Sequence, residues 1–62
     1  MASTEERLAE ALAILRIHGD GAQVHVAERI GALAVAGDAA GVERWRQIAR
    51  ALDGVLRPVG SG

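Results

Sequence analysis

The sequence predicts an all-α protein: a compact three-helix domain whose neighbouring helices run antiparallel and are joined by short Gly-containing turns. In three stretches, apolar residues recur with the 3.6-residue period of a helix. The turns Gly19-Asp20-Gly21 and Gly37-Asp38 separate these stretches, and short connections favour antiparallel helices. No segment shows the alternation of a half-buried strand. We expect residues 1–57 to form one domain and residues 58–62 to be a disordered tail.

The first helix is expected over residues 4–18. Ser3 and Glu6 have the spacing of a capping box at its start, and Gly19 can adopt the left-handed conformation that ends a helix. One face should supply the core, and Ile14 and Ile17 lie off that face. The residues of this predicted core face are Leu8, Ala11, Leu12 and Leu15.

The second helix is expected over residues 22–36, with Asp20 as its N-cap. Its apolar residues cover an arc of roughly 200°, which is wider than the ~100° stripe of a surface helix. Gly31 within the helix costs about 1 kcal/mol relative to Ala. We therefore expect close packing at a groove formed by Ala27, Gly31 and Ala34, with this helix at the centre of the domain.

The third helix is expected over residues 39–56, with Asp38 as its N-cap and Pro58 marking its end. It has the clearest division into an apolar and a polar side. Trp45 lies on the apolar side and is the only aromatic residue in the chain. We expect it to be the largest anchor of the core; the alternative is an exposed anchor for a partner.

The composition leaves few ways to stabilise so short a chain. A domain of 62 residues buries only about 60% of the surface that its unfolded form exposes. The absence of Cys excludes disulfides and thiolate metal sites, so self-association or docking on a partner remains. The apolar surface also exceeds what three helices readily hide, and Arg is enriched in interfaces. The predicted partner-binding residues are Ile14, Ile17, Val24, Arg29 and Val35, although Arg29 could instead form a surface ion pair with Glu28.

Charge gives little support for nucleic acid as a partner. All seven basic residues are Arg, and the formal net charge is −1. An Arg-rich face on the third helix could resemble a recognition helix, but Glu43 and Asp53 interrupt it. Nucleic-acid binding is therefore the alternative hypothesis rather than the main one. The Arg residues concerned are Arg44, Arg46, Arg50 and Arg57.

Catalytic and metal-binding patterns are weak. His25 and Glu28 are three residues apart on one helix face and could ligate a metal. Diiron bundles use Glu-x-x-His on two helices, whereas here the two residues stand in the reverse order and the pattern occurs only once. We therefore expect a solvated surface pair and no cofactor. A site shared across an oligomer remains open. Ser and Thr occur only near the termini and His18 ends a helix, so we expect no nucleophilic enzyme.

The sequence predicts a compartment only because it shows no pattern of a signal peptide or a membrane span. The acidic, polar start differs from a signal peptide, and no apolar run approaches the roughly 18 residues of a membrane span. We therefore expect a cytoplasmic protein without a membrane partner, and we see no pattern for a small-molecule ligand.

One stretch resembles a group of short, uncharacterised bacterial helical proteins. The shared features are the run Ala27-Glu28-Arg29-Ile30, the Gly37-Asp38 turn, then Trp45 and the pair Ile48-Ala49. The resemblance covers roughly residues 19–52 and implies a small helical protein without an activity to transfer. Together with the apolar surplus, it favours a non-enzymatic protein–protein interaction or self-associating module.

Overall fold

The computed structural model describes residues 4–57, and this part of the chain is helical with no strand. Helix α1 spans Thr4–His18, the short 3-10 helix η1 spans Gly19–Gly21, α2 spans Ala22–Val35 and α3 spans Ala39–Leu56. The predicted all-α class is therefore confirmed. The predictions for Ser3, for Pro58 and for the tail of residues 58–62 lie outside the described residues.

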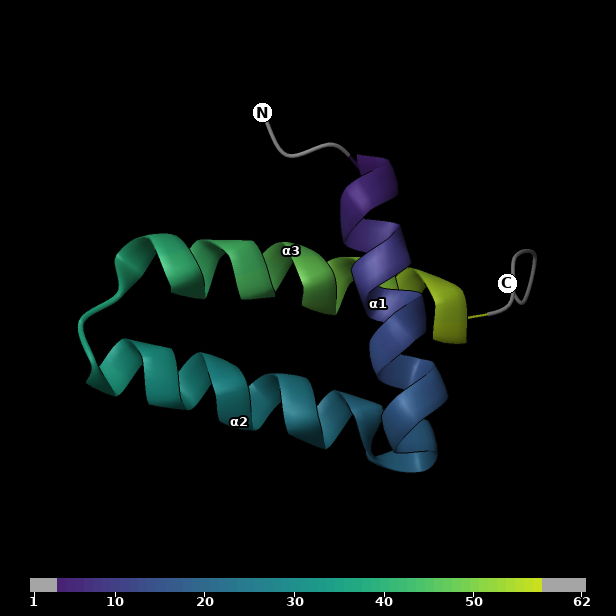
Figure 1. Cartoon of the computed structure of the whole chain (residues 1–62), viewed down its shortest axis with the longest axis horizontal. Helices are drawn as coiled ribbons and strands as arrows, with labels where there is room; N and C mark the ends of the chain where they lie inside the picture. The colour runs from purple at the N-terminus through teal and green to yellow at the C-terminus, as the bar shows by residue number, and fades with distance from the viewer. Residues whose placement is uncertain (1–3, 58–62) are drawn as a thin grey trace.

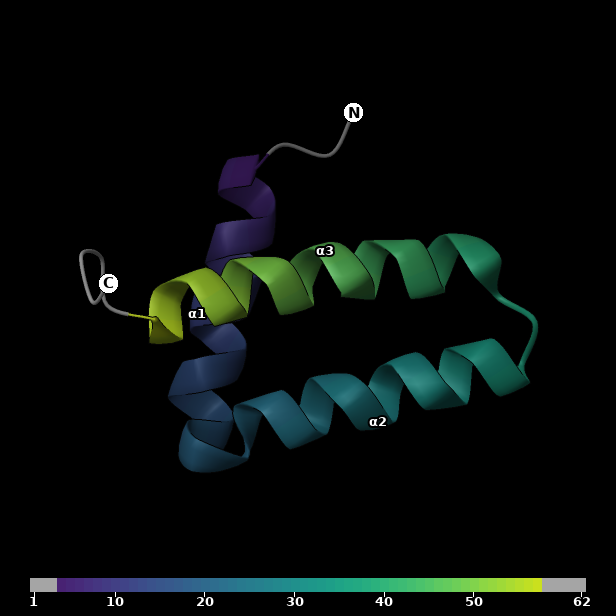
Figure 2. The same ribbon diagram turned by 180° about the vertical axis from the view of Figure 1, so that it is seen from behind.

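The helices are not all antiparallel to their neighbours. Helices α2 and α3 form an antiparallel hairpin, as expected, whereas α1 crosses α3 instead of running alongside it (Figures 1 and 2). Gly19 has the left-handed φ of 54° that the sequence predicted, so α1 does end there. The chain nevertheless does not reverse, because only the three residues of η1 separate α1 from α2. This short helix advances the chain by only about 6 Å, less than the 8–10 Å between the axes of packed helices. Consequently α1, η1 and α2 form one bent helical stretch.

The turn between α2 and α3 reverses the chain because it leaves helical geometry. Gly37 has a φ of 76°, and Asp38 has a ψ of 83°. The Asp38 amide donates to the Leu33 carbonyl at 3.0 Å, and the Gly37 amide donates to the Ala34 carbonyl at 3.1 Å. This pair of bonds is a Schellman motif, which satisfies the last carbonyls of α2.

The predicted N-caps have different outcomes. The Asp38 carboxylate accepts a hydrogen bond from the Gly41 amide at 2.9 Å, so the cap of α3 is confirmed. The cap of α2 was predicted wrongly. Asp20 lies inside η1, and the residue before α2 is Gly21, which makes no side-chain cap. Asp20 therefore lies one residue too early to occupy the N-cap position of α2.

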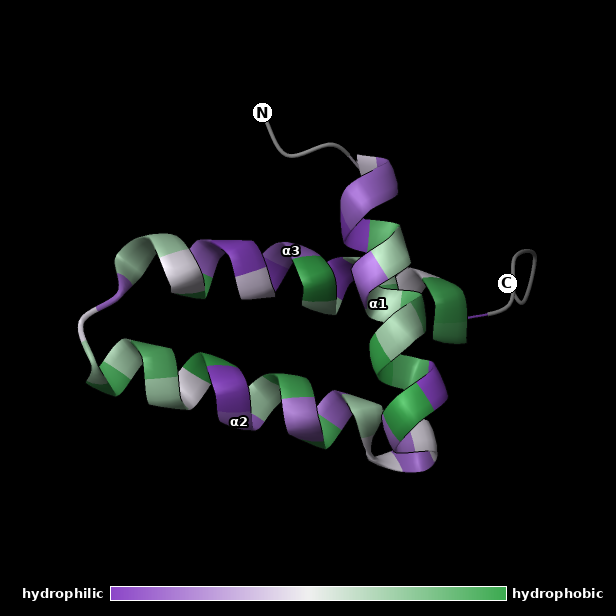
Figure 3. Ribbon diagram, in the orientation of Figure 1, coloured by the Kyte–Doolittle hydropathy of each residue, from purple (hydrophilic) through white to green (hydrophobic). Residues whose placement is uncertain are grey.

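Helix α3, rather than α2, is the central element. It packs against both other helices, while α1 and α2 meet mainly around their junction. Each helix contributes to one small core, and the hydropathy colouring shows apolar segments on all three (Figure 3). The core residues are Ala11 from α1, Ala22 and Val26 from α2, and Ile48 and Leu52 from α3. The expected central position of the second helix was wrong because the apolar side of α3 is wide enough to receive two helices.

The core face of α1 is rotated from the predicted one. Ala11 is fully buried, and Ile14 and Leu15 pack against the core. Leu8 and Leu12, which were expected in the core, are 39% and 46% exposed. The small side chain of Ala11 lets α1 and α3 approach closely where they cross.

Polar contacts between α1 and α3 are consistent with this rotation. The Arg7 guanidinium donates to the Gln47 side-chain oxygen at 3.2 Å. Glu10 accepts from Arg44 at 2.5 Å and also pairs with Arg7. With these contacts, the Arg7–Glu10 side of α1 faces α3, and Leu8 and Leu12 face away from it.

No helix within residues 4–57 has both the length and the apolar character needed to cross a lipid bilayer.

Candidate functional site

The side of α2 that faces away from α3 carries exposed apolar residues. Val24 is 61% exposed and Val35 is 92% exposed. Eleven residues are close to three helical turns, so both lie on the same side of α2. Gly31 lies between them and is also exposed. We call Val24, Gly31 and Val35 the α2 outer stripe.

The close packing that the sequence predicted at Gly31 does not occur within this chain. A Cβ atom added to Gly31 would have no neighbouring atom within 4 Å. Ala27 and Ala34 are exposed as well. The prediction failed because the apolar arc of α2 is wider than the one face that α3 can cover. The remaining part of the arc faces solvent.

The other predicted partner-binding residues are dispersed. Ile17 is 76% exposed near the end of α1. Arg29 is exposed but lies over the ring of Trp45, with 5.7 Å between the guanidinium carbon and the ring centroid. Ile14 packs against the core instead of facing solvent. Val24 and Val35 are thus the two predicted residues that the structure places together on one exposed stripe.

Four residues meet in the corner between α1, α2 and α3. The His18 and His25 rings stack with centroids 3.9 Å apart and planes 16° apart. His25 also presents an edge-on contact to Trp45, at 5.9 Å between centroids. Arg29 lies over the same indole, a geometry that favours cation–π attraction. We call His18, His25, Arg29 and Trp45 the corner cluster.

Sequence reasoning did not find the corner cluster, although a signal was present. His25 and Arg29 are four residues apart on α2, and this spacing places both on one side of the helix. The contact with His18 could not be predicted in the same way, because it depends on the direction in which α1 and α2 meet at the left-handed Gly19.

The sequence left open whether Trp45 is a core anchor or an exposed anchor for a partner, and its position has features of both. It is half-buried and packs against the buried core. Its exposed part is contacted by His25 and Arg29. The indole therefore joins the core to the corner cluster.

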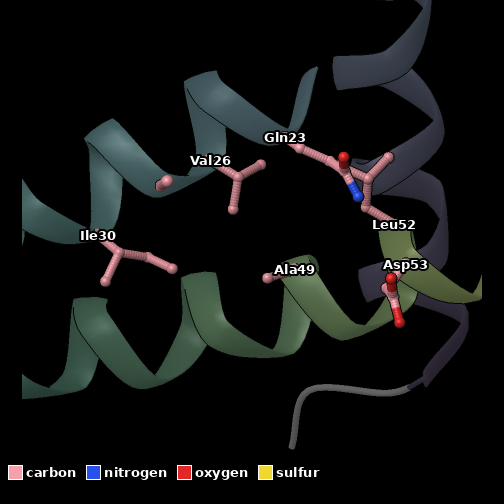
Figure 4. Close-up of a pocket in the computed structure, with 7 residues that line it drawn as sticks. Gln23, Val26, Ile30, Ala49, Leu52 and Asp53 are labelled. Atoms are coloured by element: carbon pink, nitrogen blue, oxygen red, sulfur yellow. The ribbon is translucent and has the colours of Figure 1, made fainter. Parts of the chain in front are cut away.

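A groove runs between α2 and α3 (Figure 4). Its volume is about 230 Å³, below the ~300–1,000 Å³ of typical small-molecule sites. Gln23 and Asp53 lie at one end, beside Leu52, and the rest of the lining is apolar. One amide and one carboxylate do not form a nucleophile–base pair, so the groove shows no catalytic arrangement. The remaining lining residues are Val26, Ala27, Ile30 and Ala49.

The two residues considered for metal binding, His25 and Glu28, lie in different surroundings. His25 directs its ring toward His18 and Trp45, and Glu28 is exposed. Within residues 4–57, no group of three or more His, Cys, Asp or Glu side chains is placed to hold a metal ion.

Acidic partners accompany most of the Arg residues on α3. Arg44 pairs with Glu10 of α1 at 2.5 Å. Arg50 pairs with Glu43 along α3 at 3.9 Å, and Arg57, the residue after α3, pairs with Asp53 at 3.1 Å. This face therefore carries alternating charges rather than the continuous positive surface that binds a phosphate backbone.

Comparison with known proteins adds a family but no activity. Neither a curated protein nor a solved structure matches the chain. The family DUF6961, described as a family of unknown function, matches residues 3–57. This match covers all of the described residues, and it agrees with the resemblance to small proteins without an assigned activity. The chain thus belongs to the DUF6961 family, a family of unknown function.

Proposed function

We propose that this protein is a non-enzymatic helical module that binds another protein or self-associates, and that the α2 outer stripe is its main contact surface. The observation that carries the proposal is the exposure of Val24 and Val35 on one side of α2. Full burial of a valine-sized side chain is worth roughly 1.5–3 kcal/mol. Covering this stripe would therefore stabilise a complex appreciably.

The small core supports the same proposal. Among residues 4–57, five apolar residues are buried, and three of the large aliphatic side chains on the helices remain more than half exposed. These three are Ile17, Val24 and Val35. A domain with so little buried surface gains stability from any partner that binds the folded state alone.

Two of the predicted contact residues lie away from the proposed contact surface. Arg29 lies toward α3, over the ring of Trp45, and so falls outside the α2 outer stripe. Ile14 packs against the core and is not part of the proposed contact surface. The lack of Cys is compatible with work in the reducing cytoplasm, the compartment that we propose.

The test uses a photo-cross-linking amino acid in place of Val24 in the full chain, expressed in the native host. We expect a discrete adduct that disappears when Val35→Glu is added, because that change puts a charge within the proposed interface. Ala40→Glu is the matched control, since Ala40 is exposed on α3. It should leave the adduct intact.

Circular dichroism of each variant establishes that the helices are intact. Sedimentation of the unmodified chain should show association or, with the partner added, a complex. A chain that stays monomeric and gives no Val35-dependent adduct would refute the proposed function.

A further inference from the structure

The outer side of α1 carries a second exposed stripe, on a different helix from the proposed contact surface. Glu5, Ala9, Leu12 and Arg16 follow one another at intervals of four, three and four residues. This spacing places them in one line along a helix. All four are exposed. We call them the α1 outer stripe.

The stripe is charged at both ends and apolar in the middle. Glu5 lies in the first turn of α1 and Arg16 in the last. Neither has an ion-pair partner within residues 4–57. Exposed Leu8 and Ala13 flank the middle of the stripe.

This order of residues is complementary to itself when two copies of α1 run antiparallel. Glu5 of each copy then lies opposite Arg16 of the other, and Ala9 lies opposite Leu12. Leu8 and Ala13 pair in the same way. All these pairs are centred on one point, between Glu10 and Ala11. A two-fold interface requires such reciprocal contacts.

The shape of the α1 surface fits the same arrangement. Ala9, Leu12, Ala13 and Arg16 line a shallow hollow. Small residues let two helices approach closely, and a leucine from the facing helix can enter such a hollow as a knob enters a hole. In Figure 1, α1 lies in front of α3, and Figure 3 shows no other helix covering its outer side.

We propose that the chain forms a two-fold symmetric homodimer through antiparallel contact between the α1 outer stripes of two copies. This inference rests on the proposed function, of which it names one partner, a second copy of the chain. It leaves the α2 outer stripe available to another protein. The α2 outer stripe is a poorer choice for the homodimer because its adjacent charge, Glu28, would meet no opposite charge on a second copy.

The length of the contact sets the strength expected of the dimer. Fifteen residues give α1 a length of roughly 22 Å. A contact between two helices of this length buries less than the ~1,600 Å² of a standard interface. We therefore expect a dimer with a dissociation constant in the range of about 10 µM to 1 mM, in exchange with the monomer.

Charge exchange gives a sharp test by sedimentation equilibrium at low salt. Glu5→Arg and Arg16→Glu each place like charges opposite each other in the dimer. Each should weaken dimerisation by about tenfold, as two attractive exposed pairs become repulsive. The double variant Glu5→Arg/Arg16→Glu should restore the original affinity. An equimolar mixture of the two single variants should form a heterodimer, because both of its pairs are attractive.

A cysteine experiment tests the geometry independently, since the chain has no Cys of its own. Ala9→Cys mixed with Leu12→Cys should form the mixed disulfide in preference to either homodimeric disulfide. Val24→Cys mixed with Leu12→Cys is the control, and it should show no such preference.

The outcomes separate this inference from the proposed function. A wild-type chain that is monomeric to millimolar concentration, but still gives the Val35-dependent adduct, overturns the dimer alone. The α1 dimer is also overturned if the affinity of the dimer does not change in the charge-exchange variants but Val35→Glu abolishes dimerisation. That result would assign self-association to α2. Absence of both association and adduct overturns both proposals.

Discussion

The imidazole of His18 lies flat against the imidazole of His25, with centroids 3.9 Å apart, across the bend that joins α1 to α2. His25 in turn contacts Trp45 of α3. One chain of ring contacts thus links all three helices. These contacts add to the packing of α1 against α3, and together they hold the direction in which α1 leaves α2.

Replacing His25 should weaken the fold more than replacing His18. His25→Ala removes two ring contacts, whereas His18→Ala removes one, and each such contact is worth about 0.5–1.5 kcal/mol. We expect the free energy of unfolding to fall by about 1–2 kcal/mol for His25→Ala and by about half as much for His18→Ala. Urea unfolding followed by Trp45 fluorescence measures both. Glu28→Ala, on the exposed part of α2, is the control; equal effects of the two His variants would contradict the ring-contact chain.

Trp45→Ala should leave the domain largely unfolded. Truncating a large core aromatic costs about 3–5 kcal/mol, and the half-buried position of Trp45 places the cost near 3 kcal/mol. Thermal unfolding followed by circular dichroism is the measurement, because this variant has no indole. Arg29→Ala, which removes only the cation–π contact, should cost about 0.5–1 kcal/mol. A well-folded Trp45→Ala chain that fails to bind its partner would instead identify Trp45 as an interface anchor.

The turn between α2 and α3 should depend on two adjacent residues. Asp38→Ala removes the side-chain cap of α3 and should lower the free energy of unfolding by about 1 kcal/mol. Gly37→Ala forces a side chain into the left-handed region and should cost about 1–2 kcal/mol. Denaturant unfolding gives both values. Asp38→Asn retains a capping oxygen and should stay close to the wild type; a loss as large as that of Asp38→Ala would argue against the cap.

Two glycines within helices should respond to alanine in opposite ways. Gly31→Ala should stabilise the isolated chain by about 0.5–1 kcal/mol, because the new methyl group meets no atom and alanine favours a helix. Gly41→Ala should destabilise it, since a Cβ there would lie 2.5 Å from Asp38 Oδ2 and 3.1 Å from Leu33 Cδ2. The melting temperature should rise for Gly31→Ala and fall for Gly41→Ala, relative to the unmodified chain.

Gly31→Ala also reports on the proposed function. If a partner packs closely on the α2 outer stripe, the variant should fold better but bind less tightly. Unchanged partner affinity would show that the partner does not approach the backbone at Gly31.

Duplex DNA should not bind to this protein appreciably, even at about 50 mM salt, where phosphate contacts are strongest. Three of the four Arg residues considered for this role have acidic partners. Fluorescence anisotropy with labelled duplex DNA provides the measurement. Salt-sensitive binding that weakens when Arg46 is replaced by Ala would restore nucleic-acid recognition as the function.

The sequence by itself determined the features that depend on neighbours along the chain. It placed three helical stretches close to their observed bounds, located both Gly turns and identified Asp38 as the cap of α3. These features arise from hydrogen bonds and side-chain spacings that reach only three to five residues, so they can be read locally.

Only the tertiary structure decided how those helices are arranged. Which part of a wide apolar arc is buried depends on contacts between distant residues, such as Arg7 with Gln47 and Glu10 with Arg44. These contacts lie on the side of α1 that faces α3, and the short connection through η1, which begins at the left-handed Gly19, brought His18 onto His25. The apolar arc of α2 was visible in the sequence, but its exposed side was defined only once α3 had covered the other.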